Sequence, residues 1–122
     1  MSESLLDSEM LDSYRELASP EDPDFFRRYL KTFLEGIPVQ IENIEASIRS
    51  ADAAQMARAA HAIKSSCMNV GASVLVERCA KLEAIGKSGS ISGAESLYPE
   101  IAELFRRLVE EVHALPEFRD RG

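Results

Sequence analysis

The segment AHAIKSSCMNVGA, residues 60–72, places a histidine, a lysine and two serines within six positions. His61 is one of only two histidines in the chain, and Lys64 follows it by three positions. A neutral imidazole nitrogen is a competent nucleophile near pH 7, and a nearby ammonium group could balance the charge of an arriving phosphoryl group. The pair therefore fits a phosphoryl acceptor, although an ordinary surface histidine is the simpler interpretation from these residues alone.

Other chemistry at these positions is less well supported. Ser65 and Ser66 are better interpreted as small contact residues than as nucleophiles, because no base and acid accompany them. The second histidine, His113, stands three residues after Glu110, which is half of the di-metal motif of helical bundles. The other half is missing because the chain has no second Glu-x-x-His, so His113 is interpreted as a helix-end residue and no metal is expected.

The direction of the His61 side chain follows from helical periodicity. Apolar residues recur at helical spacing in this segment, at Met56, Ala60, Ile63, Cys67 and Val70. Each residue advances about 100° around a helix, so His61 falls about 140° from Met56 and faces away from the core. The residues expected to share its face are Ala57, Lys64, Ser65 and Met68.

The same periodicity extends over nearly the whole chain, and no segment is typical of a strand. We expect helices over residues 8–18, 22–49, 52–70, 73–85 and 92–115. Four amphipathic helices joined by short turns predict an all-α, antiparallel four-helix bundle, with the short N-terminal helix capping one end. The expected division is a tail at 1–6, the bundle at 7–115 and a mobile C-terminal tail at 116–122.

Several residues mark the expected helix ends. Asp22 is expected to cap the second helix with Pro23 at its first position. Gly71 and Gly86 are expected to end the third and fourth helices. Ser92, followed three residues later by a glutamate, is expected to form a capping box for the last.

Composition bounds the class of protein. The chain has 122 residues, of which 45% are hydrophobic and 29% charged, as in a single-domain globular protein. No apolar run approaches the roughly 20 residues of a membrane span, and residues 1–10 do not resemble a secretory signal, so we expect a cytoplasmic protein with no membrane contact. Cys67 and Cys79 are expected to be reduced core residues.

The charge is unevenly distributed. The net charge of −7 argues against nucleic-acid binding. Residues 49–87, however, hold six basic and three acidic residues. The segment around His61 is thus a basic region of an acidic protein, which favours an anionic group or an acidic partner surface; chance clustering is an equal alternative.

The motif resembles the signature of histidine-containing phosphotransfer (HPt) domains of two-component phosphorelays. The family pattern is a histidine, a lysine three later, small residues four to six later and a glycine ten later. Here these are His61, Lys64, Ser65, Ser66, Cys67 and Gly71. The segments DPDFFRRYLKTFLEGIPVQIENI and ERCAKLEAIGK are also similar to the second and fourth helices of the family, so the resemblance covers about residues 7–115.

The resemblance implies roles for individual residues. His61 would be phosphorylated and Lys64 would steady the phosphoryl group. The family often has a polar residue close to the imidazole, twenty-two positions after the histidine, which is Glu83 here. A solvated surface position is the simpler interpretation of Glu83 and of Lys87, one turn later. The implied partner-docking residues are Ala57, Arg58, Ser65, Met68, Glu83 and Lys87.

One departure from the family pattern concerns the position after the lysine. Glycine is common there in the family, whereas this chain has Ser65. Serine is still small, so we expect a partner to reach His61, although the choice of partner could be narrower.

The resemblance also implies a function. The chain would accept a phosphoryl group from a receiver-domain aspartate and pass it to another receiver domain, as a monomeric phosphocarrier without kinase or ATPase activity. Its partners would be receiver domains of a hybrid sensor kinase or of response regulators. It would need no cofactor of its own, because the divalent cation would sit on the receiver. The alternatives are a receiver-binding adaptor of the same fold that carries no phosphate, and an unrelated helical enzyme or metal protein.

Overall fold

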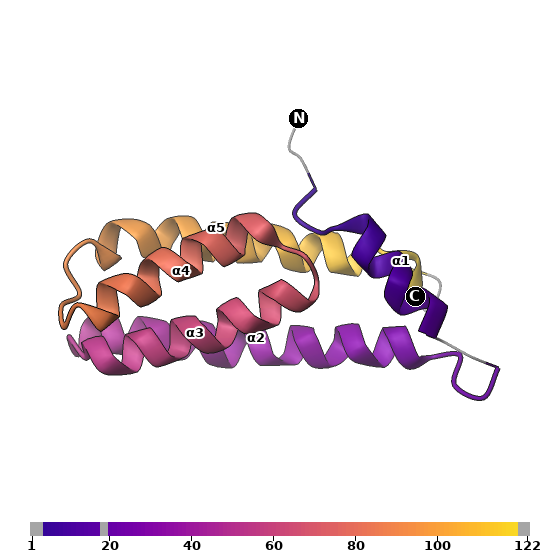
Figure 1. Ribbon diagram of the computed structural model, residues 1–122, viewed down its shortest axis with the longest axis horizontal. Helices are drawn as coiled ribbons and strands as arrows, with labels where there is room; N and C mark the ends of the chain where they lie inside the picture. Colours follow the sequence, from indigo (N-terminus) through magenta and orange to yellow (C-terminus); the bar gives the residue numbers. More distant parts are fainter. Residues whose placement is uncertain (1–3, 18–19, 120–122) are drawn as a thin grey trace.

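Helices make up most of the part of the chain that the computed structural model describes, residues 4–17 and 20–119. They are α1 (Ser8–Leu17), α2 (Phe25–Arg49), α3 (Ala53–Asn69), α4 (Ser73–Lys87), α5 (Ala94–His113) and the short α6 (Pro116–Arg119). Helices α2 to α5 run side by side, and α1 lies across one end of them (Figure 1). This confirms the predicted four-helix bundle with an N-terminal capping helix. The expected last residue of α1, Ala18, lies outside the described residues.

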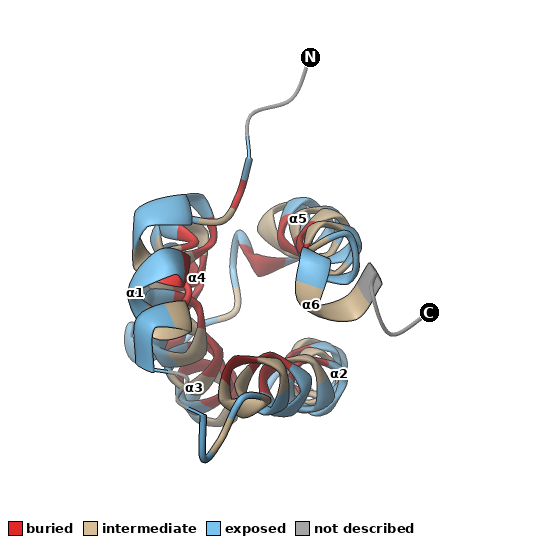
Figure 2. Cartoon of the chain, turned by 90° about the vertical axis from the view of Figure 1, so that its right-hand side faces the viewer, coloured by how far each residue is buried: buried red, intermediate tan, exposed pale blue. Residues whose placement is uncertain are grey.

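The bundle is held together by the apolar stripes of its four long helices, which meet in one core (Figure 2). The largest fully buried side chains include Leu30 and Ile44 of α2, Met56 and Ile63 of α3, Leu75 and Leu82 of α4, and Ile101 and Leu108 of α5. Helix α2 continues unbroken through Pro38. The predicted core stripe of α3 is confirmed, and it fixes the opposite face of this helix toward solvent.

Helices α3 and α4 approach each other closely at Gly86. A Cβ atom on this glycine would lie 2.6 Å from the carbonyl oxygen of Ala53 and 2.8 Å from the backbone nitrogen of Ala57. The expectation that Gly86 ends α4 is therefore wrong, because the helix continues to Lys87 and the glycine serves helix–helix contact instead. Gly71 does terminate α3 as predicted, in the left-handed conformation with φ +68°.

Two expected N-caps are also wrong. The Asp22 carboxylate accepts from both terminal nitrogens of Arg28, at 2.6 Å each, and α2 begins only at Phe25. Ser92 does not form the expected capping box, because Gly93 occupies the N-cap position with φ +94° and α5 begins one residue later. Both helices therefore begin further along the chain than the side-chain pattern predicted.

The segment after α5 was expected to be a mobile tail, but residues 116–119 form α6. Glu117 of α6 accepts from Arg15 of α1, with its Oε2 2.7 Å from Nε and its Oε1 3.0 Å from Nη2. The Arg27 guanidinium lies over the Phe118 ring, 5.3 Å from its centroid. These contacts join α6 to α1 and to α2 at one end of the bundle.

The close approach at Gly86 yields a stability prediction. Replacing glycine by alanine within a helix normally stabilises it by roughly 0.5–1 kcal/mol. Gly86→Ala should instead destabilise the protein by about 1–3 kcal/mol, because the new methyl group meets backbone atoms of α3. Gly36→Ala is the matched control, since nothing lies within 4 Å of that position in α2, and it should show the normal gain. Urea unfolding measures both, and equal stability of the two variants would contradict the close approach.

Candidate functional site

His61 lies in the middle of α3 with its side chain 59% exposed. Ala60, the residue before His61, and Ile63, two residues after it, are buried in the core. The predicted outward direction of His61 is therefore confirmed. On the same side of α3, Met68 is an exposed apolar residue, and the Ser65 hydroxyl donates to the His61 carbonyl oxygen at 3.1 Å.

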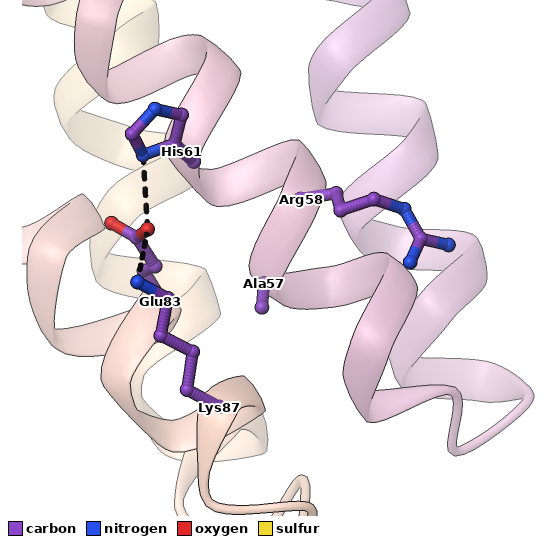
Figure 3. A pocket seen from close by; sticks show the side chains of 5 residues that line it. All are labelled: Ala57, Arg58, His61, Glu83 and Lys87. Atoms are coloured by element: carbon purple, nitrogen blue, oxygen red, sulfur yellow. Dashed lines mark hydrogen bonds and ion pairs between the residues drawn. The ribbon is translucent and has the colours of Figure 1, made fainter.

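The His61 ring is held by a carboxylate from the neighbouring helix. Glu83 of α4 places its Oε2 2.9 Å from Nδ1 of His61 (Figure 3). Its Oε1 accepts from Nζ of Lys64 at 2.5 Å, and Nζ of Lys87 lies 3.2 Å from Oε2. We call these four residues the Glu83 cluster. The Glu83 side chain is only 7% exposed, so this is a buried carboxylate with three partners.

The ionisation of Glu83 determines which ring nitrogen is free. The hydrogen bond from Lys64 is the main cause that lowers the pKa of Glu83 to about 2, against the opposing effect of burial and with further help from Lys87 and His61. An ionised carboxylate can only accept hydrogen bonds, so Nδ1 of His61 must carry the proton and donate it. In the neutral ring the lone pair is then on the other nitrogen, Nε2, which lies on the side of the ring away from Glu83 (Figure 3).

The burial of Glu83 is the feature of the site that the sequence interpretation missed. The resemblance placed this residue near the imidazole, but a solvated position was preferred. A signal was present in the sequence, because Glu83 follows Cys79 by four residues and precedes Gly86 by three, and both of these are buried. Residues at such spacings share one face of a helix, which here is the face that packs against α3.

An open pocket of about 360 Å³ lies beside the ring. It is lined by Ala57, Arg58, His61, Glu83 and Lys87, so the structure brings five of the expected site residues together (Figure 3). Ala57 is buried at its base, and the Arg58 side chain extends away from Glu83. Lys64 lies on the Glu83 carboxylate instead of lining this pocket, while Ser65 and Met68 lie further along α3.

Other reactive side chains lie apart from this site. Cys67 and Cys79 are free and buried, as predicted. Burial raises the pKa of both thiols, to about 12 for Cys79, so neither is poised as a nucleophile. His113 is the last residue of α5 and packs edge-on against Phe118.

Two features are absent from the described residues. No group of three or more His, Cys, Asp or Glu side chains among them could hold a metal ion. No helix in the same part of the chain is both long and apolar enough to cross a membrane.

Comparison with known proteins gives two results. The family model described as the Hpt domain matches residues 28–115. The crystal structure of histidine-containing phosphotransfer protein B (HptB) from Pseudomonas aeruginosa PAO1 superimposes with a TM-score of 0.81. The two chains are 25% identical, over 91% of this chain and 93% of that one. A comparison with curated protein sequences finds no match.

The depressed pKa of Glu83 predicts how stability depends on pH. A carboxyl group whose pKa falls from 4.5 to about 2 on folding stabilises the protein fully above pH 4.5, and that contribution is lost as the pH falls toward 2. The difference in melting temperature between the parent and Glu83→Gln should therefore be largest above pH 4.5 and should shrink as the pH falls toward 2. Glu77→Gln, an exposed position on the same helix, controls for the loss of a surface charge. A difference that stays constant over this range would show that Glu83 is not held ionised by its partners.

Proposed function

The chain belongs to the Hpt domain family, and on that premise we propose that it carries a phosphoryl group on His61, received from a receiver-domain aspartate and passed to another receiver domain. Family membership gives the chain a histidine phosphotransfer role in phosphorelays. Hpt domains are phosphocarriers that interact with receiver domains. The assignment of the phosphorylated residue, the partners and the absence of enzymatic activity belong to the proposal.

The observation that carries the proposal is the state of the His61 ring. Its Nδ1 is occupied by the bond to Glu83 at 2.9 Å, while Nε2 is free on an exposed side chain. In the proposed step, the Nε2 lone pair attacks the phosphorus of an aspartyl phosphate. The N–P bond forms as the O–P bond breaks, and the electron pair stays on the aspartate oxygen. Positioning and electrostatics provide most of the catalysis in such transfers.

The surrounding residues divide the remaining tasks. The Lys64 ammonium donates to Oε1 of Glu83 at 2.5 Å. Lys64 therefore affects the phosphorylated ring indirectly, by holding the carboxylate that binds Nδ1. We assign receiver contact to the surface around the ring, which is formed by the exposed side chains of Arg58, Ser65, Met68 and Lys87 and by the buried Ala57 and Glu83 in the pocket beside the ring. The divalent cation is assigned to the receiver and no cofactor to this chain. We further propose that the chain works as a monomer in the cytoplasm.

The proposal is tested by mixing the protein with a phosphorylated receiver domain. The parent should acquire phosphate that is labile in acid and stable in alkali, and His61→Gln should acquire none. The variant loses the hydrogen bond of the ring to the buried Glu83 carboxylate, which should cost about 1–3 kcal/mol of stability, so circular dichroism is needed to show that loss of acceptance does not reflect unfolding. Phosphate on the His61→Gln variant would overturn the site. Binding of the receiver without any phosphate on the parent would instead identify a receiver-binding adaptor.

A second test concerns the surface beside the ring. Ser65 lies one turn after His61 on an exposed face, so Ser65→Glu adds bulk and negative charge where a receiver with an acidic pocket must approach. The rate of transfer should fall by about tenfold or more, which needs only about 1.4 kcal/mol of added barrier.

The matched control is Ser65→Gly, which should retain transfer while costing about 0.5 kcal/mol of helix stability. Circular dichroism would verify that both variants fold. Transfer by Ser65→Glu at the parental rate would remove this face of α3 from the docking surface.

A further inference from the structure

The proton on Nδ1 of His61 has a consequence for the phosphorylated protein. When Nε2 takes up a phosphoryl group, a ring that was neutral becomes a cation, provided that Nδ1 keeps its proton. Glu83 is the acceptor of that proton, and its Oε2 lies 2.9 Å from Nδ1. The Glu83 carboxylate that orients the ring before phosphorylation therefore lies beside a positively charged ring after phosphorylation.

Departure of the phosphoryl group depends on this proton. With Nδ1 protonated, attack by an aspartate on phosphorus breaks the N–P bond and returns the electron pair to Nε2, which leaves a neutral imidazole. No proton has to move in that step. Without the Nδ1 proton, the same cleavage would leave an imidazolate anion, a much poorer leaving group. A phosphohistidine that loses this proton is therefore slow to donate.

We propose that Glu83 retains the Nδ1 proton of phosphorylated His61 and so extends phosphoryl donation to neutral and alkaline pH. The inference rests on the proposed function. Glu83 is a positioning residue in this account, because it acts through the ring and does not touch phosphorus.

The charges around the ring support this role and also limit it. Arg58 and Lys64 of α3 and Glu83 and Lys87 of α4 are the charged groups that face or adjoin the ring. Lys64 binds the other carboxylate oxygen, Oε1, and holds Glu83 in its ionised form without occupying the oxygen that the ring needs. Lys87 differs, since its Nζ lies 3.2 Å from Oε2 itself. Lys87 therefore competes with the ring for the same oxygen.

The arrangement predicts opposite effects of two substitutions. Glu83→Gln removes the negative charge beside Nδ1, so the phosphorylated ring should lose its proton at a lower pH. The pH at which the rate of donation falls to half of its maximum should decrease by about one unit or more. This shift is equivalent to a decrease of about tenfold in the proton affinity of Nδ1 in the phosphorylated ring. Lys87→Gln removes the competing cation and should move the same midpoint to the alkaline side by a few tenths of a unit. The Lys87 side chain is 70% exposed, so the fold should tolerate this change.

The experiment uses the full chain loaded with phosphate by potassium phosphoramidate, so that no partner is needed for loading. After removal of the reagent, the rates of hydrolysis and of donation to an unphosphorylated receiver domain are measured between about pH 5.5 and 9. The nitrogen chemical shifts of the phosphorylated ring, followed by NMR over the same range, report the Nδ1 proton directly. Glu77→Gln, whose carboxylate pairs with Arg78 and Lys81 and not with the ring, should match the parent.

Each outcome has a distinct meaning. At the alkaline end, Glu83→Gln should donate at least about threefold more slowly than the parent, and at the acid end no more slowly. A rate reduced by the same factor at every pH would overturn the inference, because a merely structural role of Glu83 has that signature. An unshifted midpoint in Lys87→Gln together with an unshifted one in Glu83→Gln would also overturn it. Failure of the loaded parent to donate to the receiver at any pH would refute the proposed function instead.

Discussion

The close contact of α3 with α4 at Gly86 is the constraint on which the site depends. Because that position has no side chain, the backbone of α4 comes within van der Waals distance of Ala53 and Ala57. Glu83 lies one turn earlier on the same face of α4, and the short distance between the helices brings its carboxylate to the ring of His61. A wider spacing would leave the carboxylate short of the ring and open the interface to water.

Burying an ionised carboxylate is unfavourable unless its hydrogen-bonding capacity is filled. Here Lys64 occupies one oxygen of Glu83, and His61 and Lys87 share the other. Because each oxygen has its own partners, the orientation of the carboxylate is fixed. The carboxylate in turn fixes the orientation of the ring and the position of the proton on Nδ1. The Glu83 cluster thus holds an exposed histidine, which would otherwise rotate freely, in one orientation with one ring nitrogen bound and the other free.

The parts of this arrangement that depend on one helix were predictable from the sequence, and those that depend on two were not. Helical periodicity was sufficient to place Ile63 in the core and His61 outside it, because both positions lie on one regular element. Gly86 was misassigned because a glycine that ends a helix and a glycine that admits a neighbouring backbone look alike in one sequence. The burial of Glu83 depends on that same contact, so it was missed for the same reason. Asp22 illustrates a further limit, since a side chain suited to capping a helix formed an ion pair with Arg28 instead.

The end of the bundle that α1 covers lies apart from the helix contact on which the site depends. Ion pairs and ring contacts of α1 and α6 close that end. Gly86 instead contacts Ala53, the first residue of α3, and the turn from α2 to α3 lies at the opposite end of the bundle (Figure 1). Charge follows a related division, because residues 49–87, which include α3 and α4, are net basic in a chain of net charge −7. Under the proposed function, a receiver domain with an acidic phosphorylation pocket would therefore be attracted to the helix pair that carries His61 and repelled by the rest of the chain. The sign of the charge would thus favour encounters in which the free ring nitrogen faces the phosphoryl group of the proposed partner.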